Sequence, residues 1–140
     1  FDTFPQTSLF LVHARSASFP QHKGIIEFNQ PFVSEKYAFV FNGLLRGVSL
    51  SSVPGKIGAE KIWYLLQKEL TNNDPAQALE KIKQLLTDNS KEIIALNIGL
   101  ASKETIYSVN YFTKNPEYYT LHEWNEDVVK VICSESLDGF

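Results

Sequence analysis

An arginine and an asparagine-glycine pair are the residues in the first third of this 140-residue chain whose chemistry suits ligand binding. Arg15 ends an apolar run, and Asn42-Gly43 follows the aromatic run 37–41. The planar guanidinium of arginine is well shaped for a carboxylate, and glycine lets a main chain approach a ligand closely. Each also has an ordinary explanation, because Arg15 could form a surface ion pair and Asn-Gly is a frequent turn dipeptide.

The single cysteine and the three histidines offer less chemistry. We interpret Cys133, in a late apolar segment, as a buried packing cysteine, since free cysteine is among the most buried residue types. His13, His22 and His122 do not recur at the spacing of metal ligands, so we expect no zinc site. We expect His13 to order the end of its strand by hydrogen bonding.

The composition is that of one globular domain and argues against several classes of function. Hydrophobic residues make up 44% and charged residues 21% of the chain, near the globular average. The net charge of −3 argues against a nucleic-acid-binding surface, which needs a basic stripe. Apolar runs are shorter than a membrane span, and a lone cysteine rules out an intrachain disulfide framework. We therefore expect a soluble, cytoplasmic protein without nucleic-acid or membrane partners.

Two helices are predicted in the middle of the chain. Residues Ile57–Leu70 place apolar side chains at three- and four-residue intervals, as one face of an amphipathic helix does. Asp74 is a suitable N-cap for a second helix, and Pro75 suits the first turn of that helix. Asp88-Asn89 is expected to end it.

Strands are predicted before and after this helix pair. Ser8–Arg15 and Tyr37–Phe41 are apolar runs without helical spacing, and Phe19–Gly24 between them is punctuated as a loop. Strands joined by short turns form antiparallel hairpins, so we predict an α+β domain with helices on one face of an antiparallel sheet. The four later strands are expected at Ile93–Leu100, Thr105–Phe112, Tyr118–Trp124 and Val128–Cys133.

Three motifs follow one another in the first part of the chain: His13-Ala14-Arg15-Ser16-Ala17-Ser18, Asn29-Gln30-Pro31-Phe32 and Phe39-Val40-Phe41-Asn42-Gly43-Leu44-Leu45. Together they resemble the glutamine amidase domain of class-II glutamine amidotransferases, in particular its small stand-alone members. Glu60 in the following helix and the late segment Val131-Ile132-Cys133-Ser134-Glu135-Ser136-Leu137 fit the same order. Each motif alone is weakly specific, whereas all of them in order, from about Leu9 to Leu137, are fairly specific.

The resemblance implies the N-terminal-nucleophile hydrolase fold, an αββα sandwich of two antiparallel sheets between helical layers. It implies hydrolysis of the glutamine side-chain amide, or of a related γ-glutamyl compound, by an N-terminal cysteine whose α-amino group is the base. Carried over by position, Arg15 binds the substrate α-carboxylate, the Asn42 amide and the Gly43 N–H form the oxyanion hole, and Ser18 lies near the substrate. No cofactor or metal is implied, and a partner domain or subunit would accept the ammonia.

The chain departs from the family pattern at the nucleophile. The fourteen residues before Arg15 contain no cysteine, the chain opens on Phe1, and it contains no methionine. We therefore interpret residues 1–140 as one partial domain, with the N-terminal strands and their cysteine expected upstream.

Two further departures concern the substrate. Gly58 stands where the family has an aspartate that holds the substrate α-amino group, and Phe41 replaces a commonly found histidine. The missing carboxylate favours a substrate without a free α-amino group, or a weakened specificity.

The sequence leaves three interpretations open. The first is an amidase whose cysteine lies upstream, and the second is a catalytically inactive domain that binds a ligand or a protein. The third is an unrelated α+β interaction module. An upstream cysteine favours the first, an intact reading frame without one favours the second, and failure of Arg15 and Asn42 to converge on one pocket favours the third.

Overall fold

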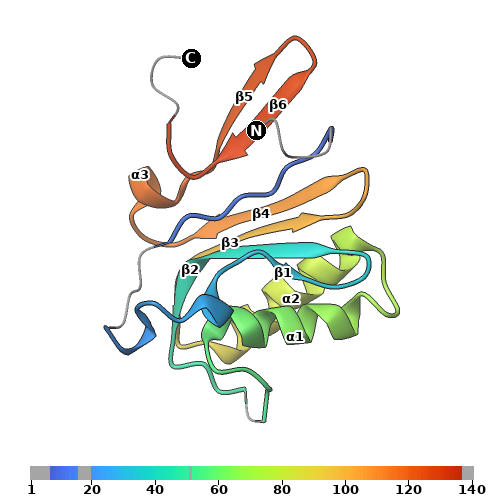
Figure 1. The fold of residues 1–140 in the computed structure, drawn as a ribbon. Helices are drawn as coiled ribbons and strands as arrows, with labels where there is room; N and C mark the ends of the chain where they lie inside the picture. The colour runs from blue at the N-terminus through green and yellow to red at the C-terminus, as the bar shows by residue number, and fades with distance from the viewer. Residues whose placement is uncertain (1–6, 16–19, 51, 137–140) are drawn as a thin grey trace.

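The computed structural model describes residues 7–15, 20–50 and 52–136 of the chain. It has an α+β fold in which two helices cover one face of an antiparallel sheet, as predicted (Figure 1). The strands of this sheet lie in the order β1-β2-β3-β4, and β5 and β6 form a separate two-stranded sheet. The strands are β1 Phe32–Val33, β2 Ala38–Arg46, β3 Glu92–Ala101, β4 Ile106–Phe112, β5 His122–Glu126 and β6 Val129–Cys133.

Helices α1 (Gly58–Glu69) and α2 (Pro75–Asn89) confirm the two predicted helices, and their ends lie within one residue of the predicted ends. Each has apolar residues recurring every three or four positions, so one face of each helix is buried against the sheet. The core between the layers includes a stacked ring pair, Trp63 of α1 on Phe39 of β2, with centroids 5.3 Å apart. The helices bury Ala59, Ile62, Trp63, Leu66, Ala78, Leu79, Ile82 and Leu86.

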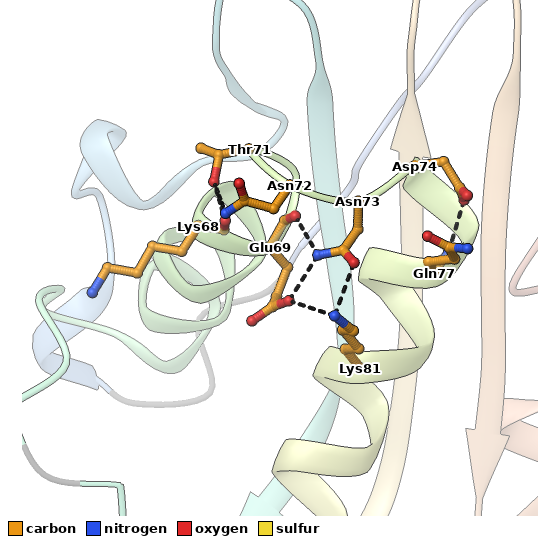
Figure 2. A network of polar contacts seen from close by, with 8 residues as sticks. All are labelled: Lys68, Glu69, Thr71, Asn72, Asn73, Asp74, Gln77 and Lys81. Carbon is orange, nitrogen blue, oxygen red and sulfur yellow. Dashed lines mark hydrogen bonds and ion pairs between the residues drawn. The ribbon is translucent and has the colours of Figure 1, made fainter.

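Polar side chains hold the turn between the two helices (Figure 2). Asp74 is the predicted N-cap of α2, because its Oδ1 accepts a hydrogen bond from the Gln77 N–H at 3.0 Å. Asn73 donates to the carbonyl and the carboxylate of Glu69, and Lys81 donates to Asn73 Oδ1 at 2.8 Å. These contacts join the end of α1 to α2 at the surface, so each contributes little on its own.

The pairing of β2 with β3 contains one irregularity, next to Gly43. Leu44 pairs with Ala95, but Leu45 pairs with Ile93, so β3 has an extra residue at this point. A Cβ on Gly43 would lie 2.3 Å from the Ala95 carbonyl oxygen. Position 43 therefore has room only for glycine, and the reason is packing.

The N-terminal segment 7–15 runs along the sheet face that is turned away from the helices (Figure 1). Leu11 lies against Gly99 of β3, where an added Cβ would meet the Leu11 Cδ1 at 3.2 Å. The short helix α3 (Pro116–Tyr119) leads from β4 to β5, and the β5–β6 hairpin lies on the same side of the sheet (Figure 1).

Two asparagines fix α3 to this face. Asn97 of β3 and Asn110 of β4 are paired in register, and the Nδ2 groups of both donate to the Tyr119 carbonyl, at 2.7 and 2.8 Å. Asn110 also donates to Asn97 Oδ1 at 2.7 Å and accepts from the Leu121 N–H at 3.3 Å. Asn97 is buried, and these bonds satisfy its amide.

Several predictions of local structure are wrong. Ser8–Arg15 forms no strand, because no described strand pairs with this segment. The predicted strand Tyr118–Trp124 begins only at His122, since Pro116 opens a short helix that ends at Tyr119. Asn42-Gly43 is not a turn, because β2 continues through it to Arg46 in pairing with β3.

The predicted antiparallel hairpins are confirmed for β3–β4 and for β5–β6, although the two hairpins belong to different sheets. The predicted loop between Phe19 and Gly24 contains one turn of 3-10 helix at Pro20–His22. In the part of the chain that the structure describes, no helix combines the length and the apolarity needed to cross a membrane.

Candidate active site

Strand β2 places Asn42 on the sheet face away from the helices. Its neighbours Phe39 and Phe41 pack on the helix side, and side chains alternate between the faces of a strand. The paired residue Asn97 uses its amide in bonds to other groups. Within residues 7–15, 20–50 and 52–136, the half-buried Asn42 amide has no hydrogen-bond partner, so its N–H groups are available to a ligand.

The Gly43 N–H points to the outer edge of β2, away from β3. Phe41 donates its N–H to Gln30 Oε1 at 2.5 Å and accepts a bond from Gln30 Nε2 at 3.2 Å, so its main-chain groups face this edge. Alternate residues of an antiparallel strand present their main-chain groups to the same side, which puts the Gly43 N–H on the same edge. Strand β1 pairs only with Ala38 and Phe39 and does not reach Gly43.

Main-chain carbonyls anchor Arg15. Its Nη1 donates to the Phe28 carbonyl at 2.9 Å, and its Nη2 donates to the His22 carbonyl at 3.2 Å. No carboxylate among the described residues pairs with Arg15, so the surface ion pair considered from the sequence is not formed there. A guanidinium has five N–H donors, so three remain for a substrate carboxylate.

His13 lies close to Arg15 and to the main chain of Phe41. Burial lowers the pKa of His13 below its ordinary value, the charge of Arg15 lowers it further, and the contact with the Phe41 main chain opposes this shift. Its Nδ1 is buried, with no hydrogen-bond partner among the residues whose placement is described. The imidazole, which lies beside the main chain of Phe41, therefore favours its neutral form.

Arg15, Asn42 and Gly43 line one cavity, which His13 and Gln30 also line. The cavity measures about 2470 Å³ and extends from β2 to the start of α1 and the β5–β6 hairpin. Small-molecule sites usually measure roughly 300–1,000 Å³, so this hollow holds more than a substrate of glutamine's size. The lining also includes residues of α1, α2, β3 and β4, so it spans both faces of the sheet, and sharing it does not by itself bring Arg15 and Asn42 to one point.

Three other positions are singled out in the sequence: Ser18, Gly58 and Glu60. Ser18 lies outside the described residues. Gly58 begins α1 and is exposed, and a Cβ there would meet nothing within 4 Å. Glu60 is occupied by its own helix start, because its carboxylate accepts the N–H groups of Lys56 at 2.5 Å and Ile57 at 3.2 Å. Neither Gly58 nor Glu60 therefore offers a free carboxylate for a substrate ammonium group.

Cys133 and Phe41 also differ from simple expectations. Cys133 is half-buried in β6 and not fully buried as predicted, and its Sγ lies 3.0 Å from the Glu135 carbonyl oxygen. Phe41, which stands in place of a histidine of the family, packs against the helix-side core and not on the Asn42 face. No group of three or more His, Cys, Asp or Glu side chains in the described ranges is placed to hold a metal ion.

The sequence indicates no role for Gln30 beyond its place in the Gln-Pro-Phe motif, yet the Gln30 carboxamide contacts the strand of the candidate site. No local pattern in the sequence indicates this contact, because it depends on how the segment before β1 approaches β2.

Comparison with protein families finds no matching family model, and comparisons with curated proteins and with solved structures find no match either. The resemblance to class-II amidotransferases therefore rests on the quoted sequence motifs alone.

Proposed function

We propose that the chain is the central part of a class-II glutamine amidotransferase domain with the N-terminal-nucleophile hydrolase fold. The observation that carries the proposal is the pair of adjacent donors on β2: the Asn42 amide, which has no partner among the described residues, and the Gly43 N–H at the open edge. Two antiparallel sheets, with helices outside the four-stranded one, support the αββα architecture.

The proposed reaction uses an N-terminal cysteine that precedes this chain. The α-amino group takes the thiol proton, and the thiolate attacks the side-chain carbonyl carbon of glutamine or of a related γ-glutamyl amide. Asn42 and Gly43 stabilise the oxyanion, while the remaining donors of Arg15 bind the α-carboxylate. The C–N bond breaks and ammonia leaves with the proton, after which water cleaves the thioester to the carboxylic acid and restores the thiol. A partner domain or subunit accepts the ammonia.

A catalytically inactive domain that binds a ligand or a protein is the second candidate. Two observations favour it: Arg15 already donates to two main-chain carbonyls, and the start of α1 offers no free carboxylate for an ammonium group. In that case the same donors bind a carboxylate or an amide without turnover.

The complete natural protein tests the proposal. We expect intact mass and N-terminal sequencing to find a mature cysteine upstream of Phe1, and we expect glutamine or a γ-glutamyl amide to release ammonia. Asn42→Ala should lower kcat by about 10²–10³-fold, because it removes one oxyanion donor, whereas Asn125→Ala on the exposed part of β5 should not. A natural protein without an upstream cysteine, or without ammonia release, overturns the amidase and leaves the binding module.

A further inference from the structure

The side chain of Gln30 takes the place of a main-chain pair at the outer edge of β2. Strand β1 pairs Phe32 with Phe39, and the same register continued by two residues would put residue 30 opposite Phe41. At this place the Gln30 carboxamide makes both bonds, donating to the Phe41 carbonyl at 3.2 Å and accepting from the Phe41 N–H at 2.5 Å. Strand β1 begins only at Phe32, so its main chain does not contribute this pair.

The segment that carries Gln30 is itself held in place. Arg15 donates to the carbonyls of His22 and Phe28, and Phe28 lies only two residues before Gln30. Phe28 is buried, and the ring of His22 packs edge-on against it with centroids 5.1 Å apart. The carboxamide of Gln30 is therefore presented to β2 from a fixed support.

His13 and Gln30 both contact the main chain of Phe41, just before the candidate oxyanion donors, and the Gln30 carboxamide bonds both the N–H and the carbonyl of Phe41. The Gly43 N–H follows on the same edge, two residues after Phe41, and the Asn42 amide leaves the strand between them. A twist of β2 at Phe41 would change the direction of both donors. Sites of this kind depend on donor geometry within about half an ångström.

We propose that Gln30 is a positioning residue, which fixes the direction of the Asn42 and Gly43 donors through the main chain of Phe41. Its effect on the edge of β2 stands independently of any reaction, whereas its effect on catalysis rests on the proposed amidase function.

Gln30→Met tests the effect on β2, because methionine keeps a similar volume and removes both hydrogen bonds. Hydrogen exchange measured by NMR should show the Phe41 N–H exchanging roughly fivefold faster or more, as expected for one lost hydrogen bond. The Gly43 N–H and Asn42 side-chain resonances should shift, while the protection of β3 amides such as Ile98 stays unchanged. Gln67→Met, at an exposed position of α1, is the matched control and should change none of these signals.

Gln30→Glu is a second variant with a different expected pattern. It keeps an acceptor for the Phe41 N–H but faces the Phe41 carbonyl with a carboxylate oxygen in place of a donor. The Phe41 N–H should therefore remain protected while the Gly43 and Asn42 resonances move. The proposal is overturned if both variants leave these resonances unchanged, and equally if protection is lost throughout β3, because Gln30 would then support the sheet as a whole.

Kinetics on the complete protein test the catalytic consequence. Gln30→Met should lower kcat by about tenfold or more with little change in KM, as expected when an interaction made only in the transition state is weakened. Loss of binding with unchanged kcat would contradict a positioning role. A wild-type protein without ammonia release contradicts the proposed function alone, and the NMR measurements then still decide the role of Gln30.

Discussion

Glycine at position 43 meets two independent requirements at the scale of a single residue. A Cβ at this position would lie 2.3 Å from the Ala95 carbonyl oxygen, so glycine is a requirement of packing. The Gly43 N–H lies on an edge that no described strand covers, which is a requirement of ligand access. A loss of activity in a Gly43 variant would therefore have two explanations, and stability has to be measured first.

Gly43→Ala should destabilise the protein by about 1–3 kcal/mol or more, because its Cβ would overlap the Ala95 carbonyl oxygen and the Phe41 ring at 2.3 and 2.8 Å. Urea denaturation followed by circular dichroism measures this. Gly58→Ala is the control, since a Cβ there meets nothing within 4 Å and alanine favours the helix that begins at this position. A Gly43→Ala variant as stable as the wild type would show that β3 moves away without cost.

At the scale of elements, the pair Asn97 and Asn110 fastens α3 to the sheet. Asn97→Ala removes a buried amide that bonds both the Tyr119 carbonyl and Asn110, so the free energy of unfolding should fall by about 1–3 kcal/mol. The Leu121 N–H, which donates to Asn110, should also lose protection from hydrogen exchange. Asn125→Ala is the control, because the Asn125 side chain bonds the exposed Glu123 side chain and, among the described residues, no other group. An unchanged stability of Asn97→Ala would mean that α3 is held by other contacts.

The elements also show where sequence patterns are sufficient and where they are not. Apolar periodicity and the Asp74 cap fix α1 and α2, because both signals are local. Whether 8–15 forms a strand and whether Asn42-Gly43 forms a turn depend on pairing with residues distant in sequence, which a local pattern does not contain. The same limit applies to the site: residue types indicated Arg15 and Asn42, but only the fold shows that carbonyls hold Arg15 and that Gln30 supports β2.

At the scale of the whole molecule, the two faces of the main sheet are used differently. The helix side is closely packed, and the largest fully buried side chains lie in or beside its core. The other side carries exposed apolar side chains of the N-terminal segment and of the β5–β6 hairpin, among them Phe10, Val128 and Val129, which line part of the cavity. The candidate donors thus stand on the open side of the sheet, supported from behind by a rigid core.

This asymmetry predicts that the 140-residue chain binds the hydrophobic dye ANS on the open side while remaining folded. Val128 lies at the tip of the β5–β6 hairpin and is 99% exposed, and Val129 begins β6 and is 52% exposed. The double variant Val128→Ser with Val129→Thr should therefore lower the dye fluorescence without loss of stability. Val33→Thr is the control, because Val33 is 70% exposed but lies on β1 outside the cavity. Equal fluorescence losses in the two variants would mean that the dye reports scattered surface residues, and the open side would then not be a distinct apolar surface.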